Sequence, residues 1–175
     1  MFNTIKSCGR IFKSAYKVTK EQGNVNDYIL SLPTIKSIDV KDYNVSVNIK
    51  MDNDAIMASG IRFGMAHFFV KNNKAHYTIL LENNTFKIGG SDLCQFIIYH
   101  ELGHFVNEVF GKYFICNTRT LANEMNADLY AVKNIGAERT LKALTTLYNQ
   151  KGISKSEIRK RIQNIELYML ANPNK

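Results

Sequence analysis

His100-Glu101-Leu102-Gly103-His104 has the pattern H-E-x-x-H and lies within a long stretch of helical periodicity. In a helix, the i,i+4 spacing puts both imidazoles on one face, one turn apart, where they can reach the same metal ion. The carboxylate beside the first histidine can face a water molecule whose pKa zinc lowers to about 7, and can take its proton. These five residues therefore predict a helix that carries the chemistry of metal-assisted amide hydrolysis.

A catalytic zinc site needs three protein ligands and an open fourth position, so a third ligand must come from elsewhere in the chain. Glu108 continues the row of the two histidines, but a third residue in a straight row is drawn out of reach of a single ion. Glu124 is better placed, at the start of the next helical segment after a loop that can turn the chain back. Asp128, one turn later, can accept a hydrogen bond from a ligating histidine. The alternative for Glu124 and Asp128 is a solvated helix face.

The segment before the motif alternates apolar and polar residues, as half-buried strands do. The clearest run is Tyr43 to Lys50. Two further runs, Ile61 to Val70 and His76 to Leu81, are joined around Asn72-Asn73 and should form a hairpin. We expect a last short strand at Phe86 to Ile88.

From Ser91 onward the periodicity is helical, and the motif helix should end at Gly111. Three more helices are expected at Leu121 to Asn134, Glu138 to Asn149 and Ser154 to Leu170. Because strands come first and helices second, the sequence predicts an α+β fold with a small antiparallel sheet followed by a helical half. Strands should fall within residues 37–90 and helices within 91–171.

The composition is that of one folded domain, residues 1–175. The 175 residues are 45% hydrophobic and include only two prolines, which leaves little room for a disordered linker. Three widely spaced cysteines without a C-x-x-C pair favour reduced thiols over disulfides or a cysteine zinc site. The apolar runs are too short to span a bilayer, and lysines interrupt any secretory signal, so we expect a cytoplasmic protein.

The formal net charge of +8 is concentrated near the two termini. Residues 1–24 should form a basic helix whose five basic side chains lie along one stripe, and Arg159-Lys160-Arg161 forms a second basic cluster. Such a helix can contact anionic lipid or nucleic acid. Without interleaved aromatic residues the nucleic-acid signal is weak, so we interpret both clusters as solvated surface and expect no nucleic-acid partner.

H-E-L-G-H followed by E-x-x-A-D resembles the gluzincin zinc metallopeptidases, and the minigluzincin and HtpX-type members in particular. The resemblance covers about residues 75–135 and extends more distantly to ImmA/IrrE-type peptidases, which usually have E-x-x-A-N. It implies one Zn²⁺ per chain, held by His100, His104 and Glu124. It further implies that Glu101 is the general base and that Asp128 supports a ligand. HtpX-type enzymes are membrane-anchored, whereas the apolar runs of this chain are too short to span a bilayer. Their location and substrates are therefore not carried over.

The resemblance also implies where a peptide substrate would lie. The strand from His76 to Glu82 would be the edge of the sheet, and an extended peptide would add beside it by main-chain hydrogen bonds. His76, Thr78 and Leu80 are then the expected substrate-binding residues.

The sequence therefore predicts a zinc-dependent endopeptidase that acts on a protein or peptide. A second hypothesis is a zinc-binding regulatory or interaction protein of the same fold with little or no turnover. The intact Glu101 favours the enzyme, because a purely structural zinc site has no need of a carboxylate there. A third hypothesis, a basic nucleic-acid-associated protein, depends on the termini alone.

Overall fold

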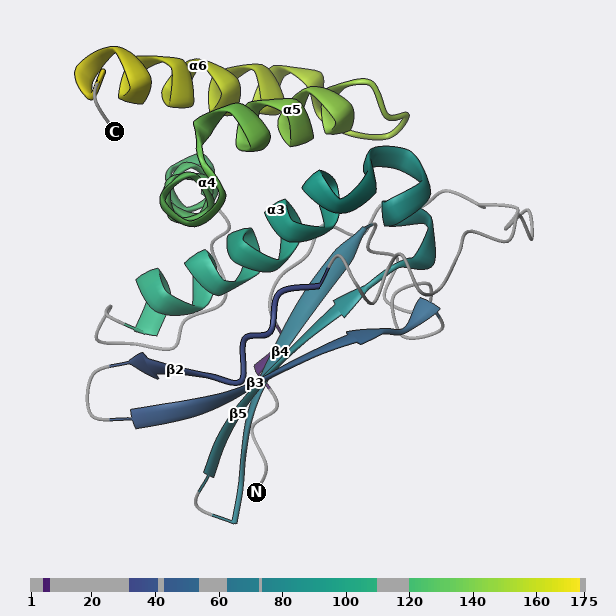
Figure 1. The fold of residues 1–175 in the computed structure, drawn as a ribbon, viewed down its shortest axis with the longest axis vertical. Helices are drawn as coiled ribbons and strands as arrows, with labels where there is room; N and C mark the ends of the chain where they lie inside the picture. Colours follow the sequence, from purple (N-terminus) through teal and green to yellow (C-terminus); the bar gives the residue numbers. More distant parts are fainter. Residues whose placement is uncertain are drawn as a thin grey trace.

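A computed structural model describes residues 5–6, 32–40, 43–53, 63–72, 74–109 and 120–173. A small sheet is followed by a helical half, which confirms the predicted α+β fold (Figure 1). The elements are β1 (Ile5–Lys6), β2 (Ser37–Val40), β3 (Tyr43–Met51), β4 (Gly64–Lys71), β5 (Lys74–Leu81), α3 (Asn83–Val109), α4 (Leu121–Ile135), α5 (Ala137–Tyr148) and α6 (Lys155–Ala171).

The sheet is mixed rather than wholly antiparallel, with the strand order β1-β4-β5-β3-β2. Three pairings are antiparallel, but β3 and β5 run parallel from Val45 opposite Ala75 to Met51 opposite Leu81. Alternating residues reveal that a segment is a strand, but they do not reveal which strand lies beside it. The predicted antiparallel sheet is therefore corrected at this one pairing.

The predicted hairpin is confirmed as β4 and β5. Lys71 pairs with Lys74 at its closed end. Asn72, at the turn, has a φ of 51°. Asparagine tolerates this left-handed conformation better than most residues and is favoured in two-residue hairpin turns. Asn72 thus marks where the chain reverses.

The strand predicted at Phe86 to Ile88 is wrong, because these residues belong to α3. Three alternating residues are too few to distinguish a strand from a helix. Gly90 has non-helical backbone angles (φ 61°, ψ −156°) and divides α3 into a short and a long part. The long part begins at Ser91, as predicted. Its predicted stop at Gly111 lies outside the described residues.

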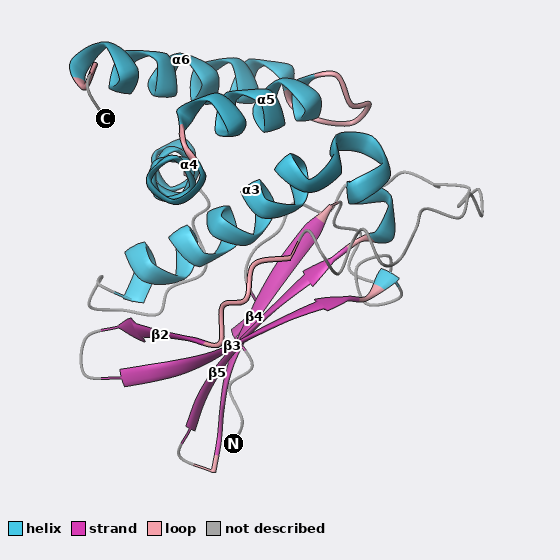
Figure 2. Ribbon diagram, in the orientation of Figure 1, coloured by secondary structure: helices cyan, strands magenta, loops and turns pink. Residues whose placement is uncertain are grey.

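The helical half covers one side of the sheet (Figures 1 and 2). The middle layer is α3, which contacts β4 and β5 on one side and α4 and α5 on the other, while α6 packs on α4 and α5. The predicted boundaries of the last three helices are correct to within one residue. Across the described residues, no helix has the length and apolar character needed to span a membrane.

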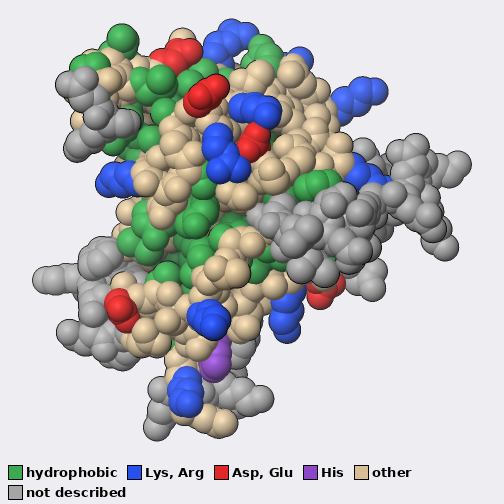
Figure 3. All heavy atoms as spheres, viewed as in Figure 1, with side chains coloured by type: hydrophobic (Ala, Val, Ile, Leu, Met, Phe, Trp, Pro, Cys, Tyr) green, Lys and Arg blue, Asp and Glu red, His purple; other side chains and the backbone are tan. Residues whose placement is uncertain are grey.

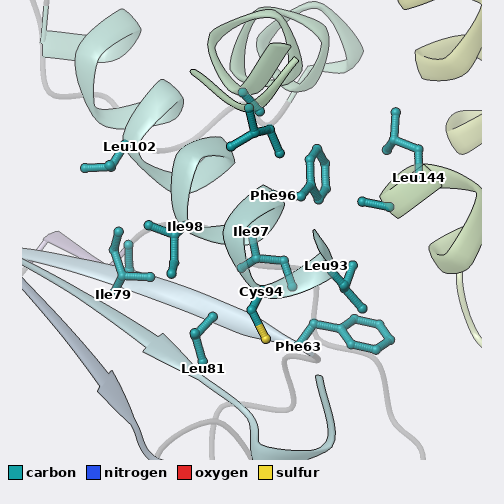
Figure 4. Packing of buried hydrophobic residues seen from close by; sticks show 14 of the residues in the cluster. Phe63, Ile79, Leu81, Leu93, Cys94, Phe96, Ile97, Ile98, Leu102 and Leu144 are labelled. Atoms are coloured by element: carbon teal, nitrogen blue, oxygen red, sulfur yellow. The ribbon is translucent and has the colours of Figure 1, made fainter. Parts of the chain in front are cut away.

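The hydrophobic core lies on both sides of α3. Figure 4 shows Ile79 and Leu81 of β5 beneath Ile98, and Phe96 on the far side, toward Leu144 of α5. All five side chains are buried. Burial on two sides fixes α3 along its length, and with it the orientation of the H-E-x-x-H segment.

The predicted basic helix over residues 1–24 is contradicted at Ile5 and Lys6, which form β1 and pair with Phe68 and His67 of β4. The rest of that segment lies outside the described residues. On the face in Figure 3, Lys and Arg side chains are spread over the helices and the sheet among other residue types, rather than gathered in one patch.

Candidate metal centre

The candidate metal centre depends on a close approach of two helices, α3 and α4, at Gly103. A Cβ atom added to Gly103 would lie 2.8 Å from both the Cα and the carbonyl oxygen of Ala127, and 2.9 Å from the Cβ of Tyr130. These distances are shorter than real Cβ contacts, and two of the atoms are backbone. Glycine inside the motif therefore lets the first turns of α4 lie directly against the two histidines of α3.

The three predicted ligands converge at this contact. The Nε2 atoms of His100 and His104 lie 3.0 Å apart, with the two rings nearly perpendicular. Glu124 places Oε1 3.3 Å from His104 Nε2, and Oε2 3.5 Å from His100 Nε2. One donor atom from each residue lies within 4.8 Å of the others, so the group can hold a metal ion.

Glu124 reaches this position because α4 begins one turn before it. Thr120 is the N-cap, and its hydroxyl oxygen accepts a hydrogen bond from the amide of Asn123 at 3.2 Å. Glu124 is thus in the first turn, where the positive end of the helix dipole favours a carboxylate.

Asp128 lies one turn further along α4 and contacts the far side of the His100 ring. Its Oδ1 atom is 2.8 Å from Nδ1 of His100, and the carboxylate is fully buried. A carboxylate accepts hydrogen bonds, so Nδ1 carries the proton and Nε2 is directed toward His104 and Glu124. In metal proteins such a contact fixes the tautomer and orientation of a ligating histidine.

Arg161 of α6 also belongs to this cluster. Its Nε and Nη2 atoms donate to the two oxygens of Asp128 at 2.7 and 2.6 Å, and Nη1 donates to Oε2 of Glu124 at 3.0 Å. The residue is 4% exposed. Two buried carboxylates on α4 are thereby bound by one guanidinium from another helix.

This burial corrects the interpretation of Arg159-Lys160-Arg161 as solvated surface. Arg159 and Lys160 are exposed, but Arg161 is not. A signal was present in the sequence, because Ile158, Arg161 and Ile165 recur at steps of three and four and share one face of a helix. The two isoleucines on that face are buried. An arginine between apolar neighbours on one face is the mark of a buried charge that needs a partner.

The electrostatics of the cluster follow from these contacts. Burial raises the pKa of Glu124, but hydrogen bonds with both histidines outweigh it and hold the pKa well below its usual range. Burial also raises the pKa of Asp128, but the positive charge of Arg161 outweighs this effect and keeps the pKa of Asp128 below its usual value. Burial lowers the pKa of His100, but its hydrogen bonds with Asp128 and Glu124 raise it to about 9. With the His100 ring neutral, as a metal ligand must be, two carboxylates against one guanidinium leave a net negative charge that attracts a cation.

Glu101, the predicted general base, follows His100 on α3 and is partly exposed. One residue is about 100° around a helix, which puts Glu101 between His104 and the side of α3 that faces the sheet. Its carbonyl oxygen accepts a hydrogen bond from the hydroxyl of Tyr77 on β5 at 2.7 Å. The sheet thus holds the backbone of the motif at this residue.

The predicted substrate strand is not an edge of the sheet. β5 lies between β4 and β3 and pairs with both along its length, so no row of main-chain groups is left for a peptide. Tyr77 and Ile79 face α3, and alternation therefore turns His76, Thr78 and Leu80 to the opposite face of the sheet. Leu80 is also buried, at 6% exposed. The predicted edge strand, from which the substrate-binding role of these three residues was inferred, is therefore wrong.

The donor set consists of two imidazole nitrogens and one carboxylate, which suits zinc and other first-row transition metals. The convergence of these three donors fits a metal ion. No protein-family model, curated protein or solved structure matches the chain. Any proposal about its function therefore depends on the residues of the cluster themselves.

Proposed function

We propose that this chain is a zinc-dependent endopeptidase. The observation that carries the proposal is the convergence of His100, His104 and Glu124, with the partly exposed Glu101 next in the chain to the first ligand. A site with three protein ligands, one of them partly exposed, is typical of catalytic rather than structural zinc.

The proposal gives each residue one task. His100, His104 and Glu124 would hold the ion, which when bound would polarise a carbonyl and lower the pKa of water. Glu101 would accept a proton from the attacking water and deliver it to the leaving amine. Asp128 would keep the proton on Nδ1 of His100 throughout.

The three proposed ligands differ in their exposure to solvent. The side chains of His100 and Glu124 are 9% and 2% exposed, whereas that of His104 is 16% exposed. A peptide would therefore approach from the side of His104, which is also the side of α3 toward Glu101. We propose the reducing cytoplasm as the location, and the buried thiol of Cys94, which is not part of a disulfide, agrees with it.

The first experiment measures metal. Protein purified without chelators should contain about one zinc per chain by elemental analysis, and His100→Ala should abolish it. His67→Ala is the matched control, because His67 lies on β4, on the face of the sheet opposite α3, and should leave the zinc content unchanged. Stoichiometric zinc in His100→Ala would show that the metal lies elsewhere.

The second experiment measures cleavage of an unfolded protein substrate and of a mixed peptide library. Glu101→Gln should retain zinc but lose at least about 100-fold in kcat/KM, because the amide cannot take a proton. Glu166→Gln, at an exposed position of α6, is the control and should be fully active. Full activity in Glu101→Gln contradicts the proposed role. A zinc-loaded wild-type chain that cleaves nothing supports the alternative, a metal-binding regulatory protein.

A further inference from the structure

Arg161 is a buried arginine that lies far along the chain from the motif that it contacts. Removing a guanidinium from water is costly, and an apolar side chain of similar size often packs as well or better in a protein core. Packing alone therefore does not account for an arginine here. What the guanidinium supplies is five donors in a fixed planar fork, which matches carboxylate oxygens.

The fork makes different contacts with its two carboxylate partners. Both oxygens of Asp128 are engaged, by Nε and Nη2, so that the carboxylate can neither rotate nor turn away from His100. On Glu124 only Oε2 is engaged, by Nη1. Its other oxygen, Oε1, is the one that lies 3.3 Å from Nε2 of His104.

We propose that Arg161 is a positioning residue of the metal centre, and that docking of α6 sets the metal affinity of the site on α3 and α4. By holding Oε2 of Glu124, Arg161 leaves Oε1 as the metal-binding oxygen. By holding Asp128, it fixes the ring of His100. The inference rests on the proposed metal site, but it does not require that the chain cleaves peptides.

A thermodynamic consequence follows. If α6 docking strengthens metal binding, metal binding must strengthen α6 docking by the same factor. Zinc should then protect the backbone amides of α6 from hydrogen exchange, although α6 supplies no ligand to the ion. A helix that only covers the site as inert packing would gain no such protection.

Arg161→Lys is the central variant, because lysine keeps the charge but loses the fork. Lys160→Met is the matched control, one residue away on the exposed face of the same helix. The zinc dissociation constant is measured by competition with a chromophoric chelator, and the visible absorption spectrum of the cobalt-substituted protein reports the ligand geometry. We expect about 10- to 100-fold weaker zinc binding and a changed cobalt spectrum in Arg161→Lys, and neither change in Lys160→Met.

A role in stability alone would lower the unfolding temperature of Arg161→Lys but leave both metal readouts as in the wild type. Zinc binding within twofold of wild type, with the wild-type cobalt spectrum, therefore overturns the inference.

If Arg161→Lys does not fold, hydrogen exchange of the wild-type chain with and without zinc decides the question. Protection of α3 and α4 without protection of α6 overturns the inference as well. A wild-type chain that binds no metal overturns both this inference and the endopeptidase, whereas one that binds zinc but cleaves nothing overturns only the latter.

Discussion

Nδ1 of His100 lies 2.8 Å from Oδ1 of Asp128, on the side of the ring away from the other ligands. The contact leaves Nε2 without a proton whenever the ring is neutral, which is the form that a metal requires. The interaction therefore orients the ring, with Nε2 toward His104 and Glu124, before an ion arrives.

Asp128→Asn should weaken zinc binding by about 10- to 100-fold, because the amide is a poorer acceptor for Nδ1–H and cannot bind the Arg161 fork through both of its atoms. Chelator competition measures the dissociation constant. Asp39→Asn is the control, because Asp39 is exposed on β2 and its Oδ1 accepts a hydrogen bond from Asn44 in the same hairpin. An unchanged dissociation constant in folded Asp128→Asn would show that the contact is dispensable.

Gly103→Ala should separate α4 from α3. The added methyl group meets backbone atoms of Ala127 at 2.8 Å, and backbone cannot rotate away as a side chain can. Overpacking of this kind costs about 1–3 kcal/mol of unfolding free energy, which urea denaturation of the metal-free protein measures. Zinc affinity should fall in the same variant, because Glu124 moves with α4. A variant with wild-type stability and affinity would mean that the helices adjust without loss.

Removal of the metal should destabilise the chain. Ligand binding to the folded state alone adds about 2.7 kcal/mol when the free ligand is 100 times its dissociation constant. A chelator should therefore lower the unfolding temperature, and added zinc should restore it. In Glu124→Gln, zinc should give little or no increase, since one of three ligands is lost. An equal increase in both proteins would point to a metal site that excludes Glu124.

The stability of the folded protein at acid pH should depend on Asp92. Hydrogen bonds from Lys142 and then Arg139 outweigh burial and lower the pKa of Asp92 below its ordinary 3.8. A carboxylate with a depressed pKa stabilises the fold above its unfolded-state pKa, and this contribution is lost as the pH falls through the folded-state pKa. Asp92→Asn should thus cost up to about 1 kcal/mol at pH 7, because the pair is near the surface.

Denaturation at several pH values tests this sign. The difference in unfolding free energy between wild type and Asp92→Asn should shrink toward zero as the pH falls below the ordinary pKa of 3.8. A difference that grows toward acid pH would contradict it.

Local signals in the sequence were sufficient for much of the fold. The H-E-x-x-H spacing predicted the helix and two ligands, Gly90 marked the start of the long part of α3, and Ser154 marked the start of α6, where its hydroxyl accepts a hydrogen bond from the amide of Glu157. Each of these signals acts within a few residues, where spacing and capping are decisive.

Long-range relationships were not predictable in this way. Alternation within one strand does not reveal which strand pairs with it. β5 pairs with β3 as well as with β4, and for this reason the strand that holds His76 to Leu80 is not an edge of the sheet. The spacing of Ile158, Arg161 and Ile165 could place Arg161 on the buried face of α6, but it could not identify the residues that Arg161 contacts. Its partners, Glu124 and Asp128, are acidic residues that a single sequence cannot pair with one of many cations.

The position of Arg161 on α6 affects when the site can form during synthesis of the chain. During synthesis α3, α4 and α5 emerge before α6, and until then Glu124 and Asp128 have no guanidinium to accompany them out of water. Without Arg161, the two carboxylates would depend on the histidines of α3 alone, and burial of carboxylate charge with fewer partners is less favourable. We therefore expect the pocket around Glu124 and Asp128 to close fully only after α6 has been synthesised, so that the last described helix completes a site whose histidines lie much earlier in the chain.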